Sequence, residues 1–349
     1  MTKQESIIKR TNPHKNIKVS VIILNWNGID LLQECLDSLS KQTFKDFETI
    51  LVDNGSSDGS VEFVEKNFPV VKIIKLNRNE GFCLGNNIGL QYARGDLIAL
   101  LNNDTLVDIH WLEELHNAMT KHHDIGLCAS CIVNYYSRDV LDTAGDGFDL
   151  CGVGYKIGEG MPVTKFQDER YVFGACAGAV LYRRSMIDEI GFFDEMFFAV
   201  GEDLDLSFRA KLAGYKCLYV PNAIIYHKIN YTVGRNSAFL LYQSRRNIEY
   251  TFFKNMPLPF MIVTLPLHII YNILTFSQAL YEKRITIFLK AKKDFVKHFK
   301  EIHRQRKEIQ SKRKISLIKL FFSFSNHYLF YRIFHKISLF FSHNQRNSK

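Results

Sequence analysis

Three acidic residues, Glu202, Asp203 and Asp205, lie within four positions of one another. They follow Gly201 at the predicted start of a helix, where the helix dipole favours negative charge. One or two of them could therefore serve only the helix, but three exceed what a helix start requires. A carboxylate in such a position can take a proton from a hydroxyl group. We predict Asp203 as a general base, with Glu202 and Asp205 supporting the loop, an acceptor or Arg209.

Two more aspartates directly follow apolar runs that are predicted to be strands. Asp104 ends the triplet Asn102, Asn103, Asp104, where one carboxylate can hold Mg²⁺ or Mn²⁺ together with water and phosphate. Asp53 follows the second run and could accept a hydrogen bond from the N3–H of uracil or thymine. Asn and Asp are also common turn residues. The prediction therefore depends on position after a strand rather than on residue type.

Strand-like and helix-like segments alternate along the first 120 residues. Apolar, β-branched runs occupy 19–24, 47–52, 71–76 and 96–101, and helical periodicity occupies 31–39, 61–68, 86–93 and 111–119. This alternation predicts a doubly wound, mostly parallel α/β sheet. In such sheets ligands bind beyond the carboxyl ends of the strands. The polar segments 25–28, 53–59, 77–81 and 102–104 should therefore meet at one rim.

The region from 125 to 230 has a less regular pattern. Strands are expected within 171–182, around several small residues, and a short helix at 203–213. Two strands, 216–220 and 223–227, are expected on either side of Pro221, because proline lacks the N–H that a sheet uses. His227 ends the second of these strands.

The segment 255–281 contains no charged residue and exceeds the ~20 residues that cross a bilayer as a helix. However, Pro257, Pro259, Pro266 and His268 interrupt it. This composition favours an interfacial or re-entrant helix over a full span.

The C-terminal part is strongly basic. Residues 283–349 contain 18 Lys and Arg against three acids, whereas residues 1–282 carry a net charge of −6. Such an arm fits an anionic partner, either membrane or nucleic acid. Its phenylalanines cluster in apolar runs, which fits lipid better than base stacking, so we expect no nucleic-acid partner. The segment 315–341 mixes apolar residues with lysine and arginine, which predicts an amphipathic helix lying on anionic lipid. The alternative for this segment is a basic helix packed on the globular part.

The cysteines and the N-terminus indicate a cytoplasmic protein. Of seven cysteines only Cys128 and Cys131 have the spacing of a zinc-binding pair, and no second pair completes such a site. Free thiols in a reducing compartment are the expected state. The polar stretch 1–17 has no apolar core of a secretory signal.

Taken in order, the polar motifs resemble those of glycosyltransferase family 2, particularly its rhamnosyltransferase-like members. The matching runs are 21–28, 52–58, 77–82, 85–89, 100–105, 174–178 and 201–206. The resemblance covers roughly 17–250. It implies a GT-A fold, a Rossmann-like α/β sheet, and a metal-dependent inverting transfer of a sugar from a nucleoside-diphosphate donor. Residues 18–250 would form the catalytic domain, 1–17 a polar tail, and 251–349 a helical extension that associates with the inner face of the cell membrane.

The resemblance also implies roles for individual residues. Those that would contact the nucleotide are Asn25, Trp26, Asn27, Asp53, Asn77, Gly81, Asn86 and Asn103. Asp104 would be the main ligand of Mn²⁺ or Mg²⁺, and His227 a further ligand. Asn102 stands where the family motif has its first acid, which makes the metal site less charged. Asp203 matches the general base.

The resemblance implies that the donor is dTDP- or UDP-linked, with rhamnose as one candidate for the transferred sugar. It implies that the acceptor is a saccharide or a lipid-linked saccharide in the synthesis of a cell-surface polysaccharide. Processive members carry Gln-x-x-Arg-Trp, whereas here Gln243 and Arg246 are followed by Asn247. This departure favours addition of a single sugar. Arg245 and Arg246 could reach the diphosphate or form a solvated helix face. The alternative function, favoured by Asn102, is a catalytically weak scaffold that binds sugar nucleotides.

Overall fold

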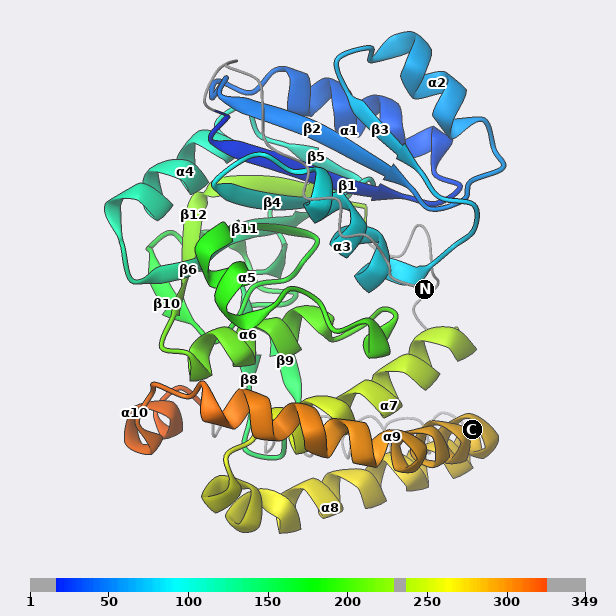
Figure 1. The fold of residues 1–349 in the computed structure, drawn as a ribbon, viewed down its shortest axis with the longest axis vertical. Coiled ribbons are helices and arrows are strands. Elements are labelled where there is room, and N and C mark those ends of the chain that lie inside the picture. Colours follow the sequence, from blue (N-terminus) through cyan, green and yellow to red (C-terminus); the bar gives the residue numbers. More distant parts are fainter. Residues whose placement is uncertain (1–16, 229–236, 325–349) are drawn as a thin grey trace, which may run out of the picture.

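In the computed structural model, which describes residues 17–228 and 237–324, ten strands form one mixed sheet (Figure 1). Eight strands follow the order β10-β12-β6-β11-β4-β1-β2-β3, while β5 pairs with β12 and β7 with β6. Strands β3, β2, β1 and β4 are parallel, and β11 inserts antiparallel between β4 and β6. The predicted doubly wound α/β sheet is therefore confirmed, with antiparallel strands added beyond β4.

The strands of this sheet are β1 (Val19–Asn25), β2 (Phe47–Asp53), β3 (Lys72–Lys75), β4 (Leu97–Asn102), β5 (Thr105–Val107), β6 (Ile125–Asn134), β7 (Leu141–Thr143), β10 (Arg170–Val172), β11 (Ala179–Arg183) and β12 (Lys216–His227). A separate hairpin consists of β8 (Asp146–Phe148) and β9 (Gly154–Lys156). The helices that accompany the sheet are α1 (Ile29–Ser40), α2 (Ser60–Asn67), α3 (Gly81–Tyr92), α4 (Trp111–Lys121), α5 (Arg184–Ile190) and α6 (Glu202–Leu212).

Both faces of the sheet are buried, which explains its continuous apolar runs. In β1, Ile22 belongs to the core on one face, while Val21 and Ile23 belong to the core on the other. All three side chains are fully buried. A strand such as β1, which carries apolar side chains on both faces, must be covered by helices on both faces of the sheet. Figure 1 shows helices on both faces around β1.

The register of the strands positions the polar rim. Asn25 pairs with Asp53 across β1 and β2, and Leu24 pairs with Asn102 across β1 and β4. On the other side, β5 follows β4 and pairs with β12, so that His227 lies opposite Thr105. Segments far apart in sequence are thereby brought to the same edge of the sheet.

Two predicted boundaries differ from the structure. Helix α3 begins at Gly81 rather than near Asn86, and 216–227 forms one strand rather than two. Pro221 is accommodated because the pairing of β12 with β6 shifts register between Val220 and Ile224, and such an irregularity leaves the missing N–H outside the ladder.

A layer of helices lies below the sheet (Figure 1) and consists of α7 (Ala238–Asn255), α8 (Leu258–Tyr281), α9 (Ile285–Ser311) and α10 (Leu317–Phe321). Helix α7 packs against α9 and touches α6, which ties the layer to the sheet domain. Within the described ranges, α8 is the one helix whose length and apolar composition would allow it to cross a membrane. The predicted amphipathic segment 315–341 lies outside the described residues beyond position 324.

Candidate active site

Asn25 joins three of the polar segments at the end of β1. Its Oδ1 accepts a hydrogen bond from Asn103 Nδ2 at 2.8 Å, and its Nδ2 donates to Asp53 Oδ2 at 3.3 Å. All three side chains are buried. Gly28 packs closely beside them, because a Cβ there would overlap Asn103 Nδ2 and lie 2.6 Å from Asn25 Oδ1, so that these amides would have to shift. The structure thus brings Asn25, Asp53 and Asn103 together.

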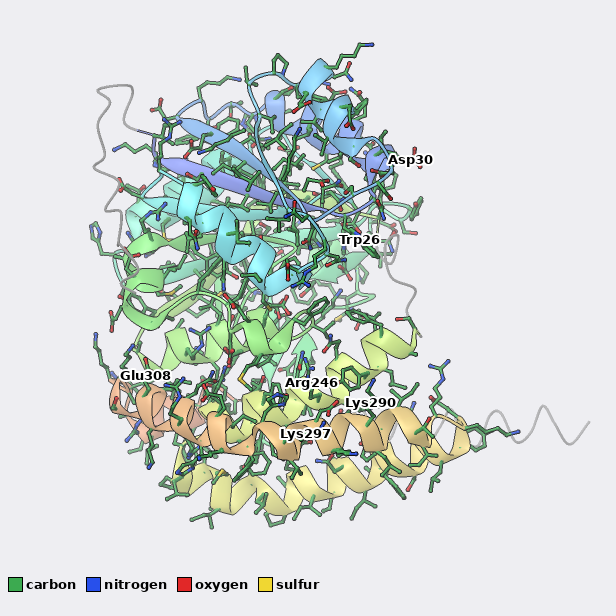
Figure 2. All side chains as sticks on the ribbon, turned by 45° about the vertical axis from the view of Figure 1, so that its right-hand side comes forward. Trp26, Asp30, Arg246, Lys290, Lys297 and Glu308 are labelled. Atoms are coloured by element: carbon green, nitrogen blue, oxygen red, sulfur yellow. The ribbon has the colours of Figure 1, made fainter. Side chains whose placement is uncertain are left out.

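The loop after Asp53 shapes the outer part of this rim. Asp53 Oδ1 accepts from the backbone N–H of Ser56 at 2.9 Å, and Ser56 Oγ accepts from Asn27 N at 2.9 Å. Asn27 has a positive φ of 49°, which asparagine tolerates better than most residues. Trp26 is 41% exposed and lies at the edge of the domain (Figure 2). Its large, partly free ring is suited to contact a ligand.

The remaining predicted nucleotide residues lie around the start of α3. Asn54 Nδ2 donates to the carbonyl of Gly81 at 3.2 Å, which connects this helix start to the loop after β2. Asn86 is buried and donates to Phe82 O at 2.9 Å, so its amide stabilises the first turns of α3. Asn77 is exposed. Asn54 was not predicted, although it stands beside Asp53 in the recognised motif.

Asp104 and His227 face each other at the next part of the rim. His227 Nε2 lies 3.3 Å from Asp104 Oδ1, and that buried oxygen accepts no hydrogen bond from the described residues. The backbone supports the pair, because Lys228 N donates to Asp104 O at 2.9 Å. A carboxylate oxygen and an imidazole nitrogen are both suitable ligands for Mn²⁺.

These two side chains fit a metal ion that takes its other ligands from water and substrate. The described parts of the chain contain no group of three or more His, Cys, Asp and Glu side chains arranged to hold a metal. Two protein ligands with substrate phosphate as partner are nevertheless the usual arrangement for such cations. Asn102 lies beside Gly178, and its backbone N donates to Gly178 O at 2.9 Å.

Asp142 and Lys156 complete this arrangement, and sequence reasoning missed both. His227 Nδ1 lies 3.0 Å from Asp142 Oδ2, and Lys156 Nζ lies 2.6 Å from Asp142 Oδ1. When Nδ1 donates to this carboxylate, Nε2 is turned toward Asp104. Such a carboxylate behind a histidine fixes the ring and its tautomer at metal sites.

The charges of this group are mutually supporting. Burial alone would lower the pKa of His227, but the neighbouring carboxylates of Asp104 and Asp142 outweigh burial and raise the pKa to about 9, so a cation that binds Nε2 must displace its proton. Burial likewise acts to raise the pKa of Asp142, yet His227 and Lys156 hold it below its ordinary value. Asp142 therefore stays ionised behind the histidine.

Asp203 lies at the start of α6, with its carboxylate held by backbone N–H groups. Oδ2 accepts from Ala177 N at 3.1 Å, and Oδ1 accepts from Leu204 N at 2.8 Å. Burial raises the pKa of Asp203, against the opposing effect of these two bonds and of Lys156. A carboxylate with a raised pKa is better suited to accept a proton near neutral pH.

Asp104 and Asp203 belong to one continuous neighbourhood. The segment 174–178 links them, because Gly178 O accepts from Asn102 N while Ala177 N donates to Asp203. Lys156 links them again from the hairpin side, since it pairs with Asp142 and its charge acts on Asp203. The pair formed by Asp104 and His227 and the predicted base are therefore not on opposite flanks of the molecule.

The two other acids of the motif have different surroundings. Asp205 is fully buried and pairs with Arg209 at 2.8 Å and with Lys254 at 2.8 Å. Burial acts to raise its pKa, but Lys254 and Arg209 outweigh that effect and lower it. Glu202 has a buried Oε2 that receives no hydrogen bond from the described residues, and burial followed by the charge of Asp203 raises its pKa well above the ordinary value.

Helix α7 holds the loop that leads into α6. Asn247 Nδ2 donates to the carbonyls of Ala199 at 2.9 Å and Val200 at 2.7 Å. Arg246 is buried and donates to Phe197 O at 2.9 Å and to Gln243 Oε1 at 2.6 Å. The motif around Arg246 therefore has a structural role. The alternative prediction that Arg246 lies on a solvated helix face was wrong.

Arg245, the other arginine predicted to reach a diphosphate, points to the helical layer. Its Nη1 donates to the hydroxyl of Tyr271 at 2.8 Å. No contact within the described ranges connects Arg245 or Arg246 to Asp104 or Asp203, and their role toward a diphosphate stays a prediction.

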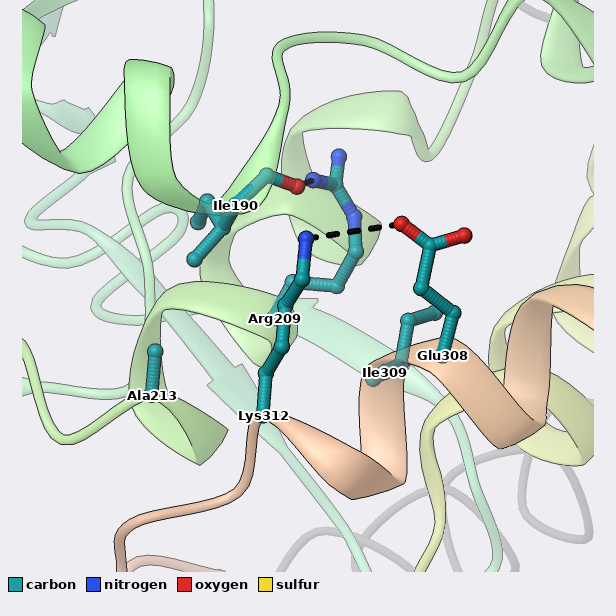
Figure 3. Close-up of a pocket in the computed structure, with 6 residues that line it drawn as sticks. All are labelled: Ile190, Arg209, Ala213, Glu308, Ile309 and Lys312. Carbon is teal, nitrogen blue, oxygen red and sulfur yellow. Dashed lines mark hydrogen bonds and ion pairs between the residues drawn. The ribbon is translucent and has the colours of Figure 1, made fainter.

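A small hollow between α6 and α9 is separate from the polar rim (Figure 3). Its lining consists of Ile190, Arg209, Ala213, Glu308, Ile309 and Lys312. Lys312 Nζ lies 3.4 Å from Glu308 Oε1, and Arg209 Nη1 donates to Ile190 O at 2.9 Å. We interpret this hollow as a joint between the helical layer and the sheet domain.

Comparison with known proteins gives relatives with roles in polysaccharide synthesis. The chain is 26% identical over 221 residues to the O-antigen biosynthesis protein RfbC of Myxococcus xanthus, covering 60% of this chain but 17% of that protein. It is 27% identical over 247 residues to the N-acetylglucosaminyl-diphospho-decaprenol L-rhamnosyltransferase of Mycobacterium tuberculosis, covering 62% of this chain and 78% of the relative. The chain thus spans less than a quarter of the length of some curated relatives.

Two solved structures share the fold. GalNAc-T7, solved with UDP, GalNAc and Mn²⁺, superposes with a TM-score of 0.55 at 20% identity, covering 67% of this chain and 48% of that one. The mannosyltransferase PcManGT of Pyrobaculum calidifontis, solved with GDP-Man and Mn²⁺, gives 0.51 at 15% identity, covering 78% and 73%. These likenesses confirm the GT-A architecture of the sheet domain.

The family model described as glycosyl transferase family 2 matches residues 20–191. This match includes the rim segments at Asn25, Asp53 and Asp104 and the segment 174–178, whereas Asp203 lies beyond its end. Together with the relatives, it places the protein: the chain belongs to glycosyltransferase family 2.

Proposed function

We propose that this protein transfers a single sugar from a nucleoside-diphosphate donor to a saccharide or lipid-linked saccharide, with inversion at the anomeric carbon. The observation that supports it most directly is the pairing of Asp104 Oδ1 with His227 Nε2 at 3.3 Å, in the same neighbourhood as Asp203. A cation bound there, Mn²⁺ or Mg²⁺, would neutralise the charge that develops on the departing diphosphate.

The protein's own groups would divide the remaining work. The carboxylate of Asp53 would accept from the N3–H of uracil or thymine, while Trp26 and Asn27 border the nucleotide. Asp142 would hold the ring of His227 in place. Asp203 would take the proton from the acceptor hydroxyl. At the same time the hydroxyl oxygen would form a bond to the anomeric carbon, and the bond from that carbon to the diphosphate would break.

The donor and the acceptor follow from the relatives rather than from the geometry. The mycobacterial relative is named for transfer of rhamnose to a lipid-linked saccharide, which favours dTDP-rhamnose as donor, with UDP-sugars as the alternative. We propose that the acceptor belongs to a cell-surface polysaccharide and is met at the cytoplasmic face of the membrane. The departure at Asn247 from the processive motif favours addition of one sugar only.

A panel of dTDP-, UDP- and GDP-sugars tests the proposal. The purified chain should release nucleoside diphosphate from one nucleotide class when Mn²⁺ or Mg²⁺ is present and lose this activity in EDTA. Release unaffected by EDTA would remove the metal from the proposal. Tight binding of a donor without turnover, with any acceptor fraction, would favour the scaffold function instead.

A further inference from the structure

The exposed apolar side chains of the protein gather on α8. Of the 24 large hydrophobic residues that are exposed within the described ranges, ten lie on this helix. Those in its central turns are between 47% and 74% exposed, namely Ile262, Val263, Ile269, Ile270 and Ile273. A patch of this kind on a water-facing surface marks an interaction site.

The opposite face of α8 is bound to the rest of the protein. Its buried residues recur at spacings of three and four and are Thr264, His268, Tyr271, Thr275 and Ala279. One face of the helix is therefore committed to the protein, and the other is left apolar and uncovered by described residues.

A charged cluster lies against the middle of α8. His268, near the centre of the helix, has Nε2 at 2.9 Å from Glu249 Oε2, and its Nδ1 donates to Cys151 O at 2.7 Å. Lys292 of α9 pairs with the other oxygen of Glu249. If α8 crossed a bilayer in this arrangement, Glu249 and Lys292 would lie at the membrane midplane, where ionised groups are strongly disfavoured.

Lysines accompany the apolar residues on the neighbouring helix α9, which runs beside α8 (Figures 1 and 2). Leu289, Lys293, Val296 and Lys300 recur at helical spacing and are exposed, so they form one stripe. Neither lysine of the stripe pairs with a carboxylate among the described residues. A stripe that mixes lysine with apolar side chains fits an anionic lipid surface.

We infer that α8 lies flat in the headgroup region of an anionic bilayer, with its Ile262–Ile273 face toward the acyl chains and the lysines of α9 at the lipid phosphates. This inference rests on the proposed function, because the contact with lipid would bring the sheet domain to acceptors carried by lipid. The contacts that hold His268 and Glu249 stay intact in this arrangement, because only the outer face of α8 meets lipid.

The full chain is used to test the inference, because α7 contributes core side chains such as Tyr250 and Phe252. It should sediment with vesicles of phosphatidylcholine and phosphatidylglycerol but not with phosphatidylcholine alone at moderate salt. The double variants Ile269→Asp with Ile273→Asp, and Lys293→Glu with Lys300→Glu, should each lower the bound fraction at least tenfold. Matched controls are Val70→Asp with Ile109→Asp, and Lys66→Glu with Lys121→Glu, all at exposed positions of the sheet domain.

Depth measurements separate a flat helix from a spanning one. Nitroxide labels at Leu258→Cys, Ile270→Cys and Leu280→Cys should report the same shallow depth by power-saturation EPR. A deep label at position 270 with shallow labels at both ends would overturn the inference, as would equal binding by the apolar double variant and wild type. An apolar face covered by a second copy, seen as a dimer that excludes vesicles, would also overturn it.

The inference can fail independently of the proposed function. Transfer to a water-soluble acceptor should be equal in wild type and in the Ile269→Asp, Ile273→Asp variant, because α8 contributes no residue to the polar rim. Loss of vesicle binding with this activity unchanged supports the lipid surface. Loss of both would indicate that α8 supports the fold instead, and would contradict the inference.

Discussion

At the residue scale, the carboxylate of Asp142 lies behind His227 and holds its ring toward Asp104. Asp104 follows a strand and His227 matches a family position, so both were predictable. Asp142 lies 85 residues before His227 in a region without recognised motifs. Only the pairing of β6 with both β7 and β12 brings it behind the imidazole. Lys156 was equally difficult to predict, because it lies on the separate hairpin of β8 and β9 and meets Asp142 only in the folded protein.

Replacing Asp142 tests whether it positions His227 for a metal. In Asp142→Asn, Mn²⁺ affinity in the presence of a nucleoside diphosphate should fall about 10-fold or more, as for other carboxylates behind metal-binding histidines. Titration of the free Mn²⁺ EPR signal measures this affinity. Asp139→Asn, an exposed neighbour, is the matched control. An affinity equal to that of wild type would show that His227 needs no such support.

At the element scale, the first half of the sheet was predictable and the loop before α6 was not. Each of the four predicted N-terminal strands lies within two residues of its observed bounds, because apolar runs covered on both faces leave a clear pattern. Helix α3 begins before its predicted start because hydrogen bonds to Asn54 and to the backbone carbonyl of Phe198 hold its first turn. Sequence periodicity does not report such tertiary contacts. Phe198 and Val200 have positive φ angles of 62° and 73°, a strained conformation that neighbouring elements must maintain.

Asn247 is the residue that maintains this loop, since it donates to Phe197, Ala199 and Val200. In Asn247→Ala the loop should relax and displace Asp203, lowering kcat on the order of 10²-fold. Mn²⁺ binding should stay within a factor of two, because Asp104 and His227 are held elsewhere. Asn67→Ala, at an exposed helix end, is the control. A kcat like that of wild type would mean that the loop holds its conformation without α7.

Glu249 should make attachment of the helical layer sensitive to acid. Burial acts to raise its pKa, but His268 and Lys292 outweigh that effect and lower it from 4.5 to about 2. Because the folded-state pKa lies below the unfolded value, the stabilisation is complete above pH 4.5 and is lost as pH falls toward 2.

Urea unfolding of wild type and Glu249→Gln at several pH values measures this contribution. At pH 7 the variant should be less stable by about 3 kcal/mol, because a buried ion pair is broken. The difference should shrink between pH 4.5 and 3. Glu282→Gln, at the exposed end of α8, should change little. A difference that stays constant with pH would exclude ionised Glu249 as the source.

At the scale of the whole molecule, a sheet domain carries the proposed site and a layer of helices lies below the sheet (Figure 1). Composition predicted an acidic globule followed by a basic arm, whereas the helical layer already begins with α7 at Ala238. Composition could not predict that α7 and α9 pack on the sheet domain through buried groups such as Lys254, which pairs with Asp194 and Asp205. Those pairings join residues more than 40 positions apart, and charge patterning along the sequence does not contain that information.

The measurement that tests the central claim most directly follows Mn²⁺ binding and sugar transfer side by side in Asp203→Asn and Asp104→Asn. Asp203→Asn should bind Mn²⁺ with nucleoside diphosphate like wild type while its transfer rate falls about 10²- to 10⁴-fold. Asp104→Asn should lose both metal binding and transfer. Transfer at the wild-type rate in folded Asp203→Asn, or unchanged Mn²⁺ binding in Asp104→Asn, would contradict the assignment of base and metal ligand.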